Sequence, residues 1–268
     1  MAERLQKFLA RAGVASRRHA EQLIAEGRVA VNEQTVARMG TQIDPALDRV
    51  KVDGREVRLP DASGYFVLYK PAGVVTTLSD PQGRATISDW VREMPRRLFP
   101  VGRLDYDAEG ALILTDDGAL AHRLSHPKFG VRRTYLAKVK GVPESAALDR
   151  LRAGVRLEDG PAKPVSVELF RAAERNTWLA IVVAEGRSHL IKRLCAAVGH
   201  PVLRLFRPSY GGVGVAGMKP GELRSLRSGE VELLESAAEG KQLADLEELF
   251  LPPRRHRAAE RAVGSKVR

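Results

Sequence analysis

Acidic side chains crowd one short stretch of the sequence, GRLDYDAEGALILTDDG, which runs from Gly102 to Gly118. Its acids lie at Asp105, Asp107, Glu109, Asp116 and Asp117. Two kinds of chemistry fit this arrangement. Acids at loop positions one, three, five and twelve, with glycine at position six, approximate a calcium-binding EF-hand loop. Alternatively, one aspartate that follows an arginine and a leucine could serve as a carboxylate nucleophile.

The calcium interpretation fails on the context of the loop. An EF-hand loop lies between two long amphipathic helices, whereas here the apolar segment ALILT occupies its second half. The acid at position twelve would be Asp116, which is shorter than the usual bidentate glutamate. Such a loop also occurs only once in the chain. The residues therefore favour a working carboxylate over a metal site.

Other short motifs give no support for a metal or nucleotide site. His122 and His126 have the i, i+4 spacing of a zinc pair, but the His-Glu-x-x-His form is absent and no cysteine lies nearby. The segment GVGVAG, residues 212–217, fits the G-x-G-x-x-G pattern, yet no strand leads directly into it and no helical pattern follows it. We interpret that segment as a loop. The sequence thus predicts no metal, no cofactor and no bound nucleotide.

The composition favours a polyanionic partner. The 268 residues contain 44 Lys and Arg against 33 Asp and Glu, a formal net charge of +11, which is typical of proteins that bind nucleic acid or an anionic surface. A membrane is disfavoured because no apolar run approaches the ~20 residues that span a bilayer. The single cysteine, Cys195, excludes an internal disulfide and fits packing in a reducing compartment. We therefore expect a cytoplasmic protein.

A break near residue 60 divides the chain, because RLPDASG supplies proline, glycine and small polar residues between two patterned regions. In residues 1–60, apolar side chains at helical spacing predict two short helices, the second capped by Ser16, and then a strand, RVAVN. Basic residues lie on the polar sides of these helices, and they either form a solvated face or bind phosphates. The candidates for phosphate contacts are Lys7, Arg11, Arg17, Arg18 and Arg28.

Residues 64–237 are predicted to form a larger domain. The segments YFVLYK, ALILT, TYLAKVK, VSVELF and WLAIVVA are typical of strands, and mostly turn-sized segments link them. The apolar stripe in HLIKRLCAAVGH predicts a helix that ends at Gly199. Strands that follow one another directly indicate an α+β fold on a mainly antiparallel sheet. In residues 238–268 we expect a short helix, QLADLEELF, and a basic, flexible tail.

Several ordered motifs resemble one family of RNA-modifying enzymes. The segment FPVGRLDYDAEGALILTDDG, with the RRTYLAKVKG that follows it, is similar to the central signature of the RsuA/RluB branch of the RNA pseudouridine synthases. YFVLYKPAGVVTT resembles the first motif of that family, and EGRSHLIKRLCAAVGHPVLRLFR resembles its last. ERLQKFLARAGVASRRHAEQLIAEGRVAVN resembles the small RNA-binding domain named after ribosomal protein S-four. Together these motifs extend from residue 3 to about residue 235.

The resemblance implies a reaction without cofactor or metal. The uracil of a uridine is detached from its ribose at nitrogen, turned within the pocket and rejoined through ring carbon 5. Asp105 matches the family's catalytic aspartate, which either attacks the anomeric carbon of the ribose or initiates a glycal route. Such a carboxylate has to stay charged in a dry pocket. A neighbouring cation opposes the cost of burial, because it typically lowers the pKa of an aspartate by roughly one to three units.

The last motif supplies the candidate cation. Lys192 matches a position at which this branch usually carries an arginine, so it keeps the charge but not the bidentate fork. We expect Lys192 to pair with Asp105, and Arg193 is the alternative. Arg187 and Arg193 are also expected to contact RNA.

The other motifs supply residues for the base and the RNA. Tyr135 matches the tyrosine that stacks on the target uracil, and its hydroxyl could assist proton transfer. Arg103 matches the arginine linked to base flipping, although a salt bridge to Asp107 or Glu109 is its structural alternative. Lys70 belongs to the first motif and is expected to shape the pocket wall.

The branch of the family indicates the partner. The motifs look most like those of RluB-type large-subunit enzymes, so we expect ribosomal RNA or a ribosomal precursor particle as partner and a monomeric protein. One alternative is a non-catalytic ribosome-assembly factor on the same scaffold, which the presence of Asp105 disfavours. A DNA-binding repressor would leave the larger domain unexplained. A glycoside hydrolase would need a second positioned carboxylate.

Overall fold

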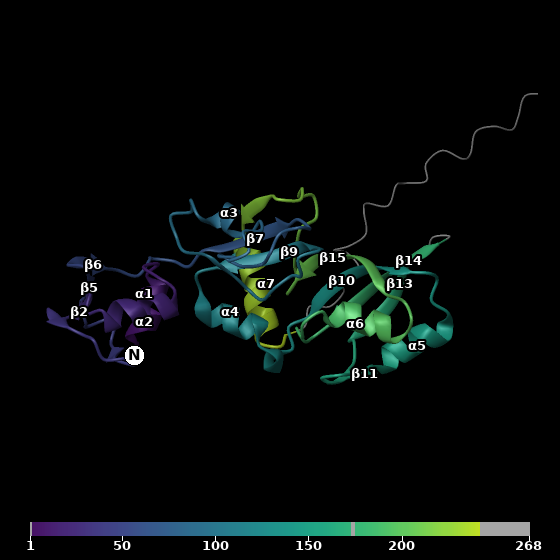
Figure 1. Ribbon diagram of the computed structural model, residues 1–268, viewed down its shortest axis with the longest axis horizontal. Coiled ribbons are helices and arrows are strands. Elements are labelled where there is room, and N and C mark those ends of the chain that lie inside the picture. Colours follow the sequence, from purple (N-terminus) through teal and green to yellow (C-terminus); the bar gives the residue numbers. More distant parts are fainter. Residues whose placement is uncertain (1, 173–174, 242–268) are drawn as a thin grey trace, which may run out of the picture.

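The structure, a computed structural model, describes residues 2–172 and 175–241. A small N-terminal module and a larger sheet-based domain lie side by side along the long axis of the molecule (Figure 1). The predicted helix QLADLEELF and the basic tail lie outside the described residues. No helix within the described ranges is long and apolar enough to cross a membrane.

The N-terminal module combines two helices with short strands. Helices α1 (Leu5–Arg11) and α2 (Arg17–Ala25) carry the predicted apolar stripes, whose side chains form its core with residues of the strands. As predicted, Ser16 caps α2, because its Oγ accepts a hydrogen bond from the backbone N–H of His19 at 3.1 Å. The strands form an antiparallel sheet in the order β3-β2-β5-β6 and a separate pair, β1 with β4. Their bounds are β1 Glu3–Arg4, β2 Val29–Val31, β3 Gln34–Thr35, β4 Gln42–Ile43, β5 Val50–Val52 and β6 Arg55–Val57.

The larger domain is built on a sheet in the order β13-β14-β10-β15-β9-β7-β17, to which β16 and β8 add at β15 and β9. All pairings are antiparallel except that of β9 with β15, which agrees with the predicted α+β fold on a mainly antiparallel sheet. The strands are β7 Tyr65–Lys70, β8 Phe99–Pro100, β9 Ala108–Thr115, β10 Arg133–Lys140, β13 Ser166–Ala172, β14 Asn176–Val183, β15 Val202–Tyr210, β16 Val213–Gly214 and β17 Leu223–Ser225. A small separate hairpin joins β11 Val155–Leu157 to β12 Gly160–Ala162.

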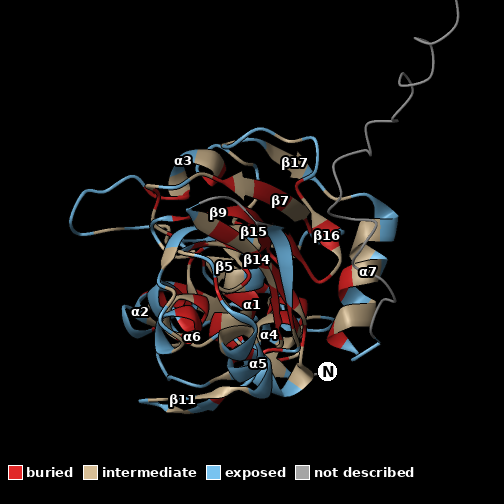
Figure 2. Ribbon diagram, turned by 90° about the vertical axis from the view of Figure 1, so that its right-hand side faces the viewer, coloured by how far each residue is buried: buried red, intermediate tan, exposed pale blue. Residues whose placement is uncertain are grey.

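Helices cover both faces of this sheet. One core contains side chains of α3, α5 and α6, and a second core contains side chains of α4 and α7. Figure 2 shows the buried strands, in red, enclosed by these helices. The bounds are α3 Ser88–Val91, α4 Gly118–Ser125, α5 Ser145–Ala153, α6 Leu190–Ala197 and α7 Ser228–Ala238, with a 3₁₀ turn at Pro127–Phe129.

Strand β9 is buried on both faces. All eight of its residues are buried, because alternate side chains enter the two different cores. Leu112 and Leu114 join the core of α6, whereas Ala111 and Ile113 join the core of α4 and α7. This double burial explains why ALILT is a continuous apolar run rather than an alternating one.

The GVGVAG segment differs from its prediction. Strand β15 ends at Tyr210, and Gly211 and Gly212, at φ of +56° and +86°, make a tight turn into β16, which pairs back on β15. The expectation of a loop with no strand leading into it is therefore wrong, because two consecutive glycines allow a hairpin there. The next element along the chain is the strand β17, so no helix opens directly after the segment.

Another glycine sets how closely β9 approaches β15. Gly110 lies opposite Arg207 in the parallel pair and has a φ of +118°. A Cβ atom at this position would lie 2.1 Å from the Arg207 carbonyl oxygen. Only glycine permits this approach, which brings Arg207 beneath the loop that carries Asp105.

Candidate active site

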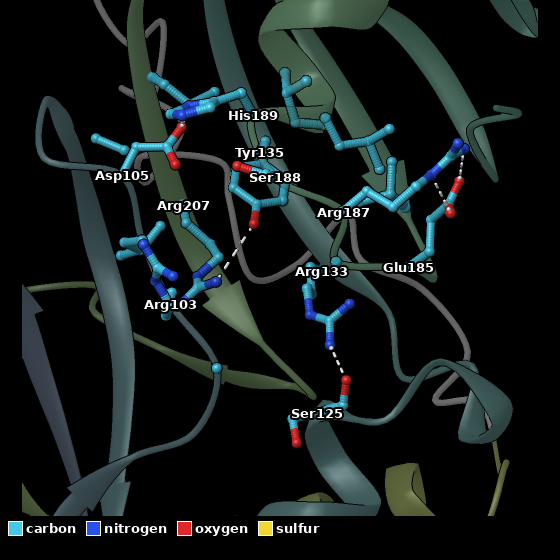
Figure 3. Close-up of a pocket in the computed structure, with 18 residues that line it drawn as sticks. Arg103, Asp105, Ser125, Arg133, Tyr135, Glu185, Arg187, Ser188, His189 and Arg207 are labelled. Carbon is cyan, nitrogen blue, oxygen red and sulfur yellow. Dashed lines mark hydrogen bonds and ion pairs between the residues drawn. The ribbon is translucent and has the colours of Figure 1, made fainter. Parts of the chain in front are cut away.

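A pocket of about 260 Å³ opens where the loop before β9, strands β10 and β15 and the start of α6 meet. Four residues predicted from two of the motifs line it, namely Arg103, Asp105, Tyr135 and Arg187 (Figure 3). The fold thus brings together the central and the last of the sequence motifs at one cavity.

The loop that carries Asp105 is held through its backbone. Thr76 Oγ1 donates a hydrogen bond to the Leu104 carbonyl at 2.7 Å and accepts one from the Leu104 N–H at 3.2 Å. The Leu104 side chain is buried in the core. The Asp105 carbonyl then accepts a hydrogen bond from Ala108 N–H at 3.1 Å, which closes the turn into β9. The Asp105 side chain, 24% exposed, is therefore presented to the pocket from a fixed backbone.

Two basic side chains approach the Asp105 carboxylate. His189 Nδ1 lies 3.0 Å and Lys192 Nζ lies 3.5 Å from Asp105 Oδ2. His189 adopts a left-handed backbone, with φ of +51°, immediately before α6, and Figure 3 shows its ring beside Asp105. His189 was not predicted from the sequence, although the motif EGRSHLIKRL contains it, because its role depends on this unusual backbone conformation.

Lys192 is shared between two acids. Its Nζ donates a hydrogen bond to Asp107 Oδ1 at 2.5 Å, which is shorter than its distance to Asp105. Burial acts to raise the pKa of Asp107, but the hydrogen bond and charge of Lys192 outweigh it and hold this pKa below its ordinary value. Arg193, the alternative cation, instead donates to Asp159 Oδ2 at 3.0 Å.

Tyr135 faces the pocket from β10 and meets an arginine that the sequence analysis did not single out. Arg207 Nη1 donates a hydrogen bond to the Tyr135 hydroxyl at 3.3 Å. Arg207 is only 1% exposed. Arginine is rarely this buried, so nothing in the local pattern VLRLFRPSY indicated that this side chain would turn into the interior.

Arg103 is a free cation on the pocket wall. Its side chain is exposed and makes no hydrogen bond or ion pair with any residue that the structure describes. The acids proposed as its structural partners are engaged elsewhere, Asp107 with Lys192 and Glu109 with Arg204 at 2.5 Å. Arg103 thus remains available to a ligand.

Arg187 is held by protein groups. Its Nε donates to Glu185 Oε2 at 2.8 Å and its Nη1 to Asp159 Oδ1 at 3.1 Å. Figure 3 shows Arg187 and Glu185 on the side of the pocket away from Asp105. Because Asp159 also holds Arg193, these arginines tie the β11–β12 hairpin to the region around α6.

Lys70 braces the loop from behind the pocket. Its fully buried Nζ donates to the carbonyl oxygens of Pro71 and Ala108, both at 2.8 Å. Burial, and then the charge of Arg207, lower the pKa of Lys70 to about 8. Lys70 is absent from the residues that line the cavity, so it supports the wall without facing a ligand.

Three of the five candidate bases in the N-terminal module are held in ion pairs. These are Lys7 and Arg11, both with Glu3, at 3.6 and 2.6 Å, and Arg28 with Asp53 at 2.7 Å. The hydrogen bonds that Arg28 donates to Asp53 raise the pKa of Arg28 above its ordinary value. Arg17 and Arg18 are exposed and form no ion pair within the described part of the chain.

A basic groove of about 360 Å³ lies between the N-terminal module and the larger domain. Its basic lining residues are Lys7, Arg11, Arg17, Arg97 and His122. Arg97 is partly buried and has no ion-pair partner among the described residues, and its burial lowers the pKa of its guanidinium. Gly102 and Ser125 line both this groove and the pocket of Asp105, so the two cavities adjoin.

The remaining candidates differ in burial. Cys195 is buried, and burial raises the pKa of its thiol to about 12. His122 and His126 are exposed, and their rings are tilted against each other with centroids 5.1 Å apart. Within residues 2–172 and 175–241, no three His, Cys, Asp or Glu side chains are grouped as they would be to hold a metal ion.

A carboxylate beside two basic side chains, in a pocket that adjoins a basic groove, suits a nucleic-acid substrate. Comparison with known proteins identifies the class of protein. Residues 64–197 match the family model described as RNA pseudouridylate synthase. Residues 3–46 match the model of the S4 domain. The protein is therefore an RNA-modifying isomerase with an N-terminal RNA-binding domain.

Relatives along most of the chain agree. The sequence is 46% identical over 235 residues to an RNA pseudouridine synthase of Aquifex aeolicus, covering 87% of this chain and 94% of the relative. It is 40% identical over 239 residues to the ribosomal large subunit pseudouridine synthase B of Bacillus subtilis, covering 88% and 97%. A crystal structure of a pseudouridylate synthase superposes with a TM-score of 0.60 at 32% identity, over 86% of this chain and 99% of that one. The chain belongs to the RNA pseudouridine synthase family.

Proposed function

We propose that this chain converts one uridine of large-subunit ribosomal RNA to pseudouridine, with Asp105 as the nucleophile. The observation that carries the assignment is the Asp105 carboxylate, held on a braced loop with basic atoms at 3.0 and 3.5 Å. The choice of large-subunit RNA is supported by the relative in Bacillus subtilis, which is named for that substrate.

Asp105 would attack the anomeric carbon C1′ of the target ribose. The electron pair of the bond from N1 to C1′ leaves with the uracil, which turns in the pocket and rejoins C1′ through C5 as the carboxylate departs. The C5 proton is then lost and N1 gains one, so the step is an isomerisation. His189 and Lys192 oppose the cost of holding the Asp105 charge away from water.

The target nucleoside would have to leave its helix to react. A pocket of about 260 Å³ suits one flipped nucleoside rather than a base pair. Tyr135 offers a flat ring for the extruded uracil. Arg103, which is exposed and without a protein partner among the described residues, would contact the RNA next to the gap.

The RNA on one side of the target would lie in the basic groove. Arg17 and Arg97 are its cations without an ion pair in the described chain, so phosphates can bind them without breaking a protein contact. Lys7 and Arg11 would have to exchange Glu3 for phosphate. In this proposal residues 1–60 bind structured RNA, residues 64–237 carry out catalysis, and a monomer acts in the cytoplasm.

Pseudouridine mapping tests the assignment of Asp105. Ribosomal RNA from cells that carry Asp105→Asn should lack one large-subunit pseudouridine present with the wild type, because an amide is a poor nucleophile. Single-turnover rates should fall by roughly 10⁴-fold or more. Asp107→Asn is the matched control, since Asp107 lies two residues away and points to Lys192.

Three results would contradict the proposal in different ways. If no site differs between wild type and Asp105→Asn, the RNA substrate is wrong. If Asp107→Asn abolishes activity and Asp105→Asn does not, the nucleophile is wrong. If the missing site lies in small-subunit RNA, only the target is wrong.

A further inference from the structure

Two arginines are buried at the floor of the active pocket. Arg133, on β10, is 5% exposed and Arg207, on β15, is 1% exposed, and both line the cavity with Asp105 and Tyr135. Neither makes an ion pair with any residue in the described ranges. Their guanidinium carbons lie on the ring of Tyr210, each 5.1 Å from its centroid.

The hydrogen bonds of these arginines go to neutral groups. Arg207 donates from Nε to the Ala111 carbonyl at 2.8 Å and from Nη1 to the Tyr135 hydroxyl at 3.3 Å. Arg133 donates from Nη2 to the carbonyls of Leu124 and Ser125, and to the Tyr210 hydroxyl, all at 3.3 Å. Arg207 Nη2 and Arg133 Nη1 are buried without a hydrogen-bond partner among the described residues.

This arrangement leaves positive charge in the interior. A buried cation costs free energy unless a carboxylate compensates it. Burial is the main cause of the lowered pKa of Lys70, and the charge of Arg207 lowers it further. Carbonyl groups alone could be satisfied by neutral donors such as glutamine. Retained, uncompensated charge beside a reacting carboxylate is typical of a functional site.

Tyr135 connects that charge to the cavity. Its oxygen accepts the N–H of Arg207, so the hydroxyl proton is left to donate to a group in the pocket. The proposed isomerisation creates a hydrogen-bond acceptor in the pocket. When the bond from N1 to C1′ breaks, its electron pair stays on the uracil and spreads onto the O2 and O4 oxygens.

We propose that Arg207, acting through the Tyr135 hydroxyl, and Arg133, acting through its charge, stabilise the anion that uracil becomes when it leaves the ribose. The proposal rests on the proposed function and adds a role for two positioning residues. The cations do not exchange protons: the uracil anion is stabilised until C5 attacks C1′ and the negative charge returns to the departing Asp105 carboxylate. Such preorganised donors act most strongly where water is excluded.

The test compares two leaving groups by the single-turnover rate at which the bond between N1 of the base and C1′ of the ribose is broken. The RNA is a large-subunit transcript with either uridine or 5-fluorouridine ligated at the mapped target position. Fluorine withdraws electrons and stabilises the uracil anion by itself, so loss of the protein's stabilisation should matter less. We expect Arg207→Met to slow cleavage at uridine by about 100-fold, but at 5-fluorouridine by several-fold less. Arg207→Lys, which keeps the charge, should recover part of the rate at uridine.

Matched variants separate this role from a structural one. Tyr135→Phe should change the ratio of the two rates in the same direction, and the double variant with Arg207→Met should add little, because both act along one hydrogen-bonded path. Arg204→Met removes an arginine of the same strand that pairs with Glu109 outside the pocket, and should leave the ratio unchanged. Arg133→Met should shift the ratio less than Arg207→Met, because no hydroxyl links it to the base.

The outcomes distinguish the two proposals. If Arg207→Met slows both substrates equally, or if Arg207→Lys recovers nothing and Arg204→Met has the same effect, the arginines are structural and this inference is wrong. If the wild-type protein breaks the N1–C1′ bond at the mapped position of neither RNA, or if Asp105→Asn retains full activity, the proposed function is wrong.

Discussion

Three acids at alternate positions of one loop have three different surroundings. Asp105 faces the pocket between His189 and Lys192, Asp107 pairs with Lys192 outside it, and Glu109 is buried against Arg204. The motif identified Asp105 as the residue to test. Asp105 and Asp107 share the amine of Lys192, whereas Glu109 pairs with Arg204, so the three carboxylates do not gather around a single metal ion.

The two buried arginines around the pocket were not indicated by the sequence. Arg207 follows an apolar strand pattern, and a single arginine there predicts an exposed position. Its burial depends on Gly110, which lies 97 residues earlier and lets the strands approach. Such a long-range steric condition leaves no mark in the local pattern, so Arg207 and Arg133 could be recognised only in the folded chain.

Lys70 gives a pH-dependent stability that can be measured. Its pKa is about 8 in the folded protein against an ordinary 10.5, so between these values the unfolded chain binds more protons. The contribution of Lys70 to stability therefore rises with pH in this window, by at most about 1.4 kcal/mol per unit. The apolar substitution Lys70→Met should abolish this rise.

Denaturant unfolding of both proteins at about pH 7.5 and about pH 9.5 checks this. Relative to Lys70→Met, the wild type should gain stability at the higher pH, while other titrating groups cancel in the difference. A difference between the proteins that does not change with pH would show that the amine titrates normally in the fold.

At the scale of elements, apolar periodicity predicted most of the sheet and the helix after His189. The segments YFVLYK, ALILT and TYLAKVK lie in β7, β9 and β10. Apolar periodicity did not predict α7, whose sequence SGEVELLESAA is largely acidic and polar. It also did not predict the two-residue strands, because these depend on pairing with adjacent strands rather than on a pattern of their own. The parallel pairing of β9 with β15 could not be predicted either, because it is a register between distant segments.

Gly110→Ala should disrupt this pairing. The new methyl group would lie 2.1 Å from the Arg207 carbonyl oxygen at a φ of +118°, so we expect a loss of roughly 3 kcal/mol or more in the free energy of unfolding. Gly160→Ala is a matched control, since Gly160 has a φ of +111° but a Cβ there would meet no atom of the described residues within 4 Å, apart from its chain neighbours. It should cost only about 1–2 kcal/mol.

Chemical denaturation of the two variants decides between steric and backbone effects. A similar loss for Gly110→Ala and Gly160→Ala would mean that the backbone conformation, and not the approach of β15, sets the requirement for glycine at position 110.

At the scale of the whole molecule, the groove between the two parts of the chain makes a prediction about salt. Each phosphate contact contributes roughly 0.7 to 0.9 to the slope of log affinity against log salt concentration. If Arg17 and Arg97 bind one phosphate each, Arg17→Gln with Arg97→Gln should lower this slope for the large-subunit transcript by about 1.5.

The control removes the same charge elsewhere. Arg150 lies on α5 and Arg171 on β13, both exposed and at the end of the molecule away from the N-terminal module (Figure 1). Arg150→Gln with Arg171→Gln should leave the slope close to that of the wild type. Equal slopes for the two double variants would mean that net charge, and not the groove, attracts the RNA.

The parallel pairing of β9 with β15 also has a consequence in time. Ala111 precedes Arg207 by 96 residues, so the pocket cannot close until nearly the whole described chain has been synthesised. The core of the N-terminal module, by contrast, joins only residues from Leu5 to Leu59, and early segments of a nascent chain fold first. If synthesis stalls before β15, the nascent chain would therefore have a folded N-terminal module that can bind RNA but no complete pocket to modify it.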